Sequence, residues 1–150
     1  PTRALPISLN YTNARYTDGR VSVLGFDFNY GPFADVPKWS GTVFAEGTLP
    51  LGDAGRVTLR GDLYSQSEMN FSNVSGTVNP NTTLPAYTLI NMRLTWGEIM
   101  GTKLQASLFV RNLTNKQYFS GGNAASNGGN TNVVNPGLPR MWGGELRFDF

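Results

Sequence analysis

The chain has 150 residues, enough for one domain, and carries a net charge of only +2 with Lys and Arg scattered along it, which argues against a nucleic-acid-binding protein. It contains no Cys and no His, so disulfides, thiolate metal sites and Cys nucleophiles are excluded, and the usual zinc ligands and the commonest general base are missing. Charged residues make up 15% of the chain, below the ~25% of an average soluble protein.

No stretch approaches the roughly 20 consecutive apolar residues of a membrane-spanning helix, which excludes an α-helical membrane protein. The chain begins at Pro1 with neither a methionine nor a signal peptide, and we expect it to be an excised piece or a mature form. Asn, Thr, Ser and Gly replace the missing charge. That composition fits either a lumen lined by neutral polar groups or a secreted β protein.

Apolar and polar residues alternate with a period of two in six long segments. Leu59 and Leu63, for example, alternate with Arg60 and Asp62. This pattern predicts six β-strands with one apolar and one polar face, and no segment shows a helical period. The predicted strands are Leu5–Thr12, Trp39–Leu49, Arg56–Gln66, Ala86–Trp96, Lys103–Tyr118 and Met141–Phe150.

The connections between these strands alternate between short and long. Leu49–Gly55 and Gly97–Thr102 are compact and rich in turn-forming residues, as hairpin turns should be. The connections over 13–38, 70–85 and 120–138 are long. A soluble sandwich does not require this alternation, whereas outer-membrane barrels have short periplasmic turns and long extracellular loops.

The direction in which each strand crosses the membrane follows if Phe150 lies at the periplasmic rim. Both short connections then fall on the periplasmic side, and the strands have about the 9 to 11 residues that cross a bilayer obliquely. Aromatic residues near the two ends of the strands then predict two girdles at the lipid interfaces. The outer girdle comprises Trp39, Tyr64, Tyr87, Tyr118 and Trp142, and the inner one Trp96, Phe148 and Phe150.

The segment Val21–Tyr30 permits two interpretations. Its sequence, VSVLGFDFNY, is compatible with a seventh crossing that follows a turn at Asp18-Gly19. A seventh crossing would, however, place this turn in the periplasm and reverse the first strand. Parity therefore favours an extracellular β-excursion.

Six phrases of the chain, taken in order, resemble the carboxyl-terminal part of a TonB-dependent outer-membrane receptor. The pairing of NLTNKQY, at Asn112–Tyr118, with Pro139-Arg140 and an alternating last strand that ends in Phe is the most specific part of the resemblance, which covers nearly all of residues 1–150. The phrases are YTNARYTDG, VPKW, LPLGDAGRVTLRGD, LPAYTLINMRLTW, LFVRNLTNKQY and PGLPRMWGGELRFDF.

The resemblance implies an all-β fold, an antiparallel up-and-down transmembrane segment of a barrel of about 22 strands. Such receptors import scarce ligands, namely iron-siderophore complexes, haem, cobalamin or oligosaccharides. It implies a Gram-negative outer-membrane location and no enzymatic activity or cofactor. It also implies an amino-terminal plug that is absent here, and coupling to TonB through an equally absent segment. Isolated, the six strands are expected to form an open curved sheet with two unpaired edges.

The last strand carries a further implication of the resemblance. Phe150, Phe148, Leu146 and Trp142 lie on one face of an alternating strand, a pattern similar to the signal that the barrel-assembly machinery reads in outer-membrane proteins. We therefore predict that these four residues form the barrel-assembly signal, and that the other partners are outer-membrane lipid and the remainder of the same barrel.

Clusters of charged residues do not predict catalysis, because no nucleophile, metal site or His accompanies them. Asp62 with Arg60, and Glu145 with Arg147 and Asp149, are interpreted as a cross-strand polar network that faces the plug or water.

Glycine pairs occur in the long connection over 120–138. Gly121-Gly122 and Gly128-Gly129 lack a P-loop pattern and a following helix, so a phosphate site is not predicted. The polar tract over 120–132 is expected to be a mobile extracellular loop that need not adopt one conformation. Ligand contacts in the lumen or loops are possible at Tyr64, Gln66, Phe33 and near Asn123, but the sequence assigns none of them.

Two other classes of protein remain open. A complete small barrel of about eight strands would act as a membrane anchor or adhesin, and it requires eight ladders. A soluble, secreted, carbohydrate-binding β-sandwich would instead press its apolar residues into a dry inner core. For this alternative the residues to inspect are Leu104, Leu108, Val110, Leu146 and Phe148.

Overall fold

The computed structural model describes residues 2–17, 20–23, 26–72, 81–125 and 131–150. The chain is all-β, with two short 3-10 helices, η1 (Gly52–Ala54) and η2 (Ile99–Gly101), and none of the helices in these ranges is long and apolar enough to cross a membrane. The strands are β1 (Thr2–Ala4), β2 (Ile7–Tyr11), β3 (Arg20–Val23), β4 (Phe26–Asn29), β5 (Trp39–Pro50), β6 (Arg56–Gln66), β7 (Met69–Asn70), β8 (Thr83–Leu84), β9 (Tyr87–Gly97), β10 (Leu104–Arg111), β11 (Phe119–Ala125), β12 (Thr131–Pro136) and β13 (Met141–Phe148).

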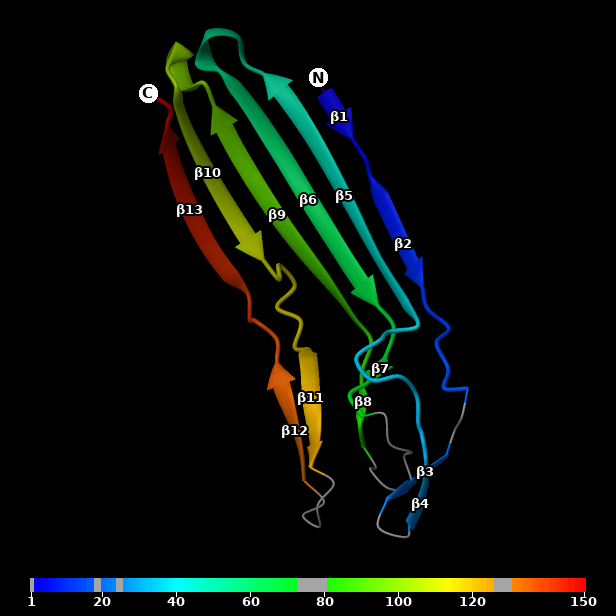
Figure 1. Cartoon of the computed structure of the whole chain (residues 1–150). Coiled ribbons are helices and arrows are strands. Elements are labelled where there is room, and N and C mark those ends of the chain that lie inside the picture. Colours follow the sequence, from blue (N-terminus) through cyan, green and yellow to red (C-terminus); the bar gives the residue numbers. More distant parts are fainter. Residues whose placement is uncertain (1, 18–19, 24–25, 73–80, 126–130) are drawn as a thin grey trace.

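One antiparallel sheet dominates the structure, in the order β1-β5-β6-β9-β10-β13, with β2 also paired to β5. Figure 1 shows it as a long, curved, open sheet with the tight turns at one end and the loops at the other. β1 and β2 pair with β5 in one continuous register, so together they make a single crossing. The prediction of six strands in an open sheet is therefore confirmed. The first strand begins earlier than expected, at Thr2, and is interrupted at Leu5-Pro6 because proline has no N–H to donate.

The two short connections are tight turns, as predicted. Gly55 has a φ of 101°, and a Cβ there would collide with the backbone of Gly97 and Glu98 in the neighbouring turn. Glu98 and Met100 adopt the left-handed conformation that non-glycine residues rarely enter, with φ values of 55° and 51°. The close approach of the two turns therefore restricts their sequence.

The expected fifth strand, Lys103–Tyr118, is shorter in the structure and ends at Arg111. Asn112 has a φ of 51°, which turns the backbone out of the extended conformation. The apolar alternation also stops here, because Asn112, Thr114 and Lys116 follow Val110 on the same face, so the sequence already marked this end of the strand.

The long connections contain three small two-stranded sheets, β3-β4, β7-β8 and β11-β12, which Figure 1 shows at the end of the main sheet opposite the turns. β3 and β4 pair with each other, and within the described residues no ladder joins them to the main sheet. This arrangement supports the interpretation of Val21–Tyr30 as a β-excursion. The Asp18-Gly19 turn lies outside the described residues.

The polar tract over 120–132, interpreted as a loop that need not adopt one conformation, contains paired strands in its described part. Phe119–Ala125 and Thr131–Pro136 form a hairpin, while residues 126–130, with Gly128-Gly129, lie outside the described ranges. The hairpin is held by a small dry core that two long connections share, because Phe71 packs over Gly122. The core comprises Met69, Phe71 and Leu84, with Ala124 and Val134 packed against it.

The main sheet is a single layer in the described residues, so the soluble sandwich is contradicted. Leu108 and Leu146 are 66% and 77% exposed, and Phe148 is exposed as well. Val110 is buried, but by its neighbours within the sheet rather than by a second layer. The complete eight-stranded barrel is not supported either, since the described residues give six crossings and β13 does not pair with β1 or β2.

Candidate functional site

The register of the main sheet separates an apolar face from a polar face. Residues directly opposite one another on antiparallel strands share a face, so the cross-strand rows can be read from the register. One apolar row comprises Gly47, Leu59, Leu94, Leu108 and Gly144. The adjacent polar row comprises Glu46, Arg60, Arg93, Phe109 and Gly143. The period of two therefore holds on the five strands that these rows cross, whereas β1 departs from it, because Arg3 lies opposite Gly47 on the apolar face.

Aromatic residues border the apolar face at both ends, but the outer girdle differs from the prediction. Tyr11 and Trp39 lie opposite each other on the apolar face, with ring centroids 4.3 Å apart. Tyr64 and Tyr87 instead lie on the polar face, in register with Thr42 and Gln66. They were assigned to the girdle by their height along the strand, although their parity already grouped them with the polar residues.

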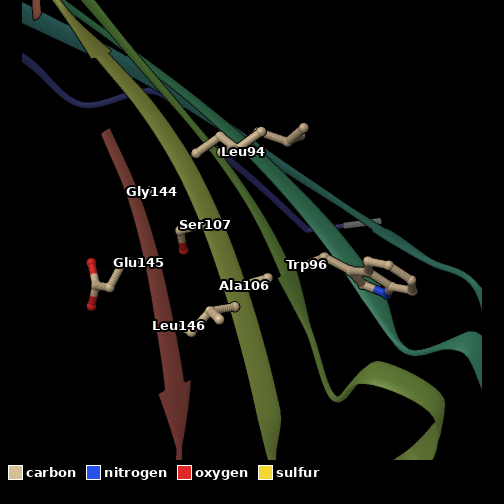
Figure 2. A pocket seen from close by; sticks show the side chains of 8 residues that line it. Leu94, Trp96, Ala106, Ser107, Gly144, Glu145 and Leu146 are labelled. Carbon is tan, nitrogen blue, oxygen red and sulfur yellow. The ribbon is translucent and has the colours of Figure 1, made fainter. Parts of the chain in front are cut away.

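The apolar face contains a hollow of about 680 Å³ where Ala106 and Gly144 leave space between larger side chains. Figure 2 shows Leu94 and Trp96 projecting from β9 on one side of the sheet, whereas Glu145 projects from β13 on the other side. The Trp96 indole N–H donates to the Ala54 carbonyl oxygen at 2.8 Å, which fixes this ring beside the turns. The hollow lacks the converging polar groups that a specific site for a polar ligand requires.

The polar face carries hydroxyl pairs and ion pairs. Thr48 bonds to Thr58 (2.9 Å between hydroxyl oxygens) and Thr95 to Ser107 (3.1 Å), so hydroxyl groups cross four strands in one row. Many polar groups of this face are therefore paired, as suits an aqueous interior, although the buried Gln66 Nε2 has no hydrogen-bond partner in the described part of the chain.

The charged residues pair differently from the expected cross-strand network. The Arg60 guanidinium binds Asp62 on its own strand, at 2.7 and 3.0 Å, and Arg147 binds Asp149, just past the end of its own strand, at 2.9 Å. Of the residues expected to form the network, only Glu145 pairs across strands, and its partner is Arg93, at 2.9 Å; outside that set, Arg56 of β6 pairs with Glu98 at 3.3 Å. Arg93 and Glu145 lie on two different strands that β10 separates, so sequence spacing gave no indication of this pair.

Three tyrosines gather on the polar face near the loops. The ring centroid of Tyr87 lies 6.0 Å from that of Tyr64 and 4.6 Å from that of Tyr118. The Tyr64 hydroxyl donates to Gln66 Oε1 at 2.8 Å, and Gln66 is buried. Two of the possible ligand residues, Tyr64 and Gln66, are thus in contact. We call the group formed by Tyr64, Gln66, Tyr87 and Tyr118 the tyrosine cluster.

The other two possible ligand residues lie elsewhere. Phe33 stacks on Tyr16 at 4.6 Å within the first long connection, and Asn123 lies in β11. The structure therefore does not bring the four residues into one pocket. No group of acidic residues in the described ranges is arranged to hold a metal ion.

Asn112 forms a buried knot at the end of β10. Its side-chain amide donates to the carbonyl oxygens of Lys116 and Leu138, at 2.9 and 3.0 Å, and its Oδ1 accepts from the Lys116 N–H at 2.8 Å. The Asn112 backbone N–H donates to Asn91 Oδ1 on β9 at 2.9 Å. Asn112 is 4% exposed, and both hydrogens of its side-chain amide are donated to acceptors inside the protein.

A second asparagine extends this knot to the start of the last strand. Asn115 Oδ1 accepts from the Arg140 backbone N–H at 3.1 Å, and the Arg140 guanidinium donates to the Leu113 carbonyl oxygen at 3.4 Å. The Tyr118 ring lies against Gly137, which has no Cβ to displace it. The two separated phrases that carried the family resemblance, NLTNKQY and Pro139-Arg140, are thus in direct contact.

The four residues of the predicted assembly signal share the apolar side of the last strand. Trp142, Leu146 and Phe148 lie in β13 and are exposed. Phe150 follows the end of the strand, and its ring meets that of Phe148 edge to face, with centroids 5.5 Å apart. The geometry is that of an exposed aromatic strand end, and its use in assembly stays a prediction.

Comparison with known proteins gives a fold and no closer relationship. No protein-family model matches the chain, and a search of curated proteins found no matching sequence. The main sheet has the fold of part of a TonB-dependent receptor barrel. The solved structure that shows this is the ferric yersiniabactin uptake receptor FyuA from Yersinia pestis, with a TM-score of 0.64 and 20% identity over 77% of this chain and 16% of that receptor.

Proposed function

We propose that residues 1–150 are the carboxyl-terminal barrel segment of an outer-membrane TonB-dependent receptor that takes up a scarce ligand. The candidate ligands are ferric siderophores, cobalamin, haem and oligosaccharides. A ferric-chelate receptor is favoured by one observation, the structural likeness to FyuA, whose name gives it a role in ferric yersiniabactin uptake.

The observation that carries the proposal is the exposed apolar face of a single-layer sheet whose opposite face is polar. Exposed apolar side chains on one face of a sheet require an apolar surrounding. Hydrocarbon satisfies this requirement, and the rings of Tyr11, Trp39 and Trp96 then lie at its two borders. The ion pairs and hydroxyl rows of the other face line an aqueous interior. A transport barrel has this division, and no acid-base or nucleophilic group suggests an enzyme.

The proposed partners follow from the same arrangement. The chain spans about one sixth of the length of FyuA, so the remainder of the barrel supplies strands to the free edges of β13 and of β1 and β2. Outer-membrane lipid covers the apolar face, and a plug domain of the same protein lies against the polar face. TonB engages the protein through its amino-terminal part, in the outer membrane of a Gram-negative bacterium.

Uptake by the full-length protein tests the proposed function. Deletion of its gene is expected to abolish energy-dependent accumulation of one radiolabelled candidate ligand, and an uncoupler is expected to have the same effect in the parent strain. Accumulation that persists for all four ligand classes in the deletion strain, under ligand starvation, would contradict a role in uptake.

We further propose that Trp142, Leu146, Phe148 and Phe150 are read by the barrel-assembly machinery where Phe150 is the final residue of the protein. Phe150→Ser, or a polar tail after Phe150, is expected to lower the amount of heat-modifiable barrel in the outer membrane, because either change removes the exposed apolar end of the signal. Phe119→Ser serves as the control, since it removes a partly exposed Phe from β11 in the loops. Equal amounts of barrel in all strains would refute the assignment.

A further inference from the structure

The side chain of Phe109 lies on the polar face, close to two guanidinium groups. The guanidinium carbon of Arg93 is 5.4 Å from the centre of the Phe109 ring, and that of Arg111 is 5.7 Å from it. The ring covers Gly143 on the adjacent strand, where a Cβ would collide with it. A glycine opposite an aromatic residue leaves the space that fixes the ring against the sheet. Arg93 and Arg111 therefore both lie near the Phe109 ring, and we call them the arginine pair.

The charge of the arginine pair is only half compensated. Arg93 binds Glu145 at 2.9 Å. Among the residues that the structure describes, no carboxylate forms an ion pair with Arg111. One positive charge beside Phe109 thus lacks a partner in this part of the wall.

A hollow of about 310 Å³ lies at the arginine pair. Arg60 and Asp62 also line it, but they neutralise each other through a forked contact, with 2.7 and 3.0 Å between the guanidinium nitrogens and Asp62 Oδ1. The Arg60 guanidinium is further held over the Phe44 ring at 4.3 Å. The groups left to bind a molecule in this hollow are therefore the arginine pair and the amide of Asn91.

The contact between Arg93 and Glu145 is open to exchange. The two side chains are 39% and 51% exposed, and ion pairs with such access to water contribute little stability. An anion that enters the hollow can therefore replace Glu145 as the partner of Arg93, and Arg111 lines the same hollow. A planar guanidinium forms two parallel hydrogen bonds with a carboxylate or a phosphate, a geometry that a monatomic anion such as chloride does not match.

We propose that the arginine pair is a binding site for a carboxylate or phosphate group of a molecule inside the lumen. The inference rests on the proposed function, and it specifies that the transported ligand carries such an anionic group. The site lies partway along the wall, because Arg93 is well inside β9, between the tyrosine cluster at Tyr87 and the turn after Gly97. The ligand would meet it after leaving the loop end of the barrel.

Titration of the full-length protein in detergent with citrate and, separately, with inorganic phosphate tests the site and distinguishes the two groups. We expect saturable binding of at least one probe at low salt. Arg111→Gln is expected to weaken it by about tenfold or more, the effect of losing one charge-assisted contact. Higher salt should weaken the binding, because the site is reached by water.

Arg147→Gln is the matched control. It removes the same charge from the same face, but on β13 and outside the hollow, where Arg147 pairs with Asp149. We expect it to change the affinity by less than about twofold. Absence of saturable binding, or an equal loss in both variants, would overturn the site. Either result leaves ligand uptake and outer-membrane location as separate readouts, so failure of the site and failure of the proposed function can be told apart.

Discussion

Asn112→Ala is expected to lower the free energy of unfolding of the full-length barrel by roughly 4 kcal/mol. Three side-chain hydrogen bonds to Lys116 and Leu138 are lost, at about 1 kcal/mol each. Alanine must in addition adopt the left-handed conformation of residue 112, which costs roughly 1 kcal/mol more than for asparagine. The measurement is denaturant unfolding of the purified protein in lipid or detergent, followed by tryptophan fluorescence.

Two companion variants separate the causes of this loss. Asn112→Asp keeps an acceptor for the Lys116 N–H but replaces two donors with a buried carboxylate oxygen, so we expect it to be strongly destabilising as well. Asn115→Ala has a similar left-handed backbone but loses one exposed hydrogen bond to Arg140, so its effect is expected to be about half as large. A loss below roughly 1 kcal/mol for Asn112→Ala would show that the knot does not stabilise the barrel.

Leu108→Arg is expected to destabilise the barrel by about 2–4 kcal/mol, the cost of an arginine near the bilayer midplane on the lipid-facing side of a barrel. Leu108 is near the middle of β10, is 66% exposed and lies on the apolar face. The expected result is less folded protein in the outer membrane and a lower unfolding midpoint in liposomes. The effect should shrink in detergent micelles, which deform around a charge more easily than a bilayer does.

Thr42→Arg is the control for this prediction. Thr42 is exposed and lies opposite Tyr64 on the polar face, so an arginine there meets water. We expect a change within about 0.5 kcal/mol. If the two arginines had equal effects, the assignment of the two faces to lipid and to an aqueous lumen would be wrong.

The faces of the sheet could be predicted from the sequence because a strand alternates strictly and six segments are long enough to show it. The ends of strands could not be predicted as well. Pro6 interrupts the first strand without any change in the apolar pattern, whereas the left-handed Asn112 ends the fifth strand where the apolar alternation also stops. The positions of Tyr64 and Tyr87 were recoverable from parity alone, which separates them from Trp39 on the apolar face.

Contacts between distant segments account for the rest of what the sequence did not predict. The β11-β12 hairpin depends on Phe71, which belongs to another connection, and a polar, glycine-rich tract gives no local indication of such a partner. Arg93 forms an ion pair with Glu145, and β10 lies between the two strands that carry them. The arginine pair likewise depends on the register that brings Phe109 opposite Gly143.

The Asn112–Leu138 contact also bears on the evolution and engineering of the loop that it closes. The contact joins the two ends of the segment between β10 and β13, so the alignment of β13 on β10 is set locally, whatever lies between them. The entropic cost of closing a loop grows only with the logarithm of its length. In addition, the hydrogen bond from Asn112 to Leu138 already holds the two ends of this loop together. Insertions between β11 and β12, such as an epitope tag or a longer hairpin from a related receptor, should leave the last strand in place.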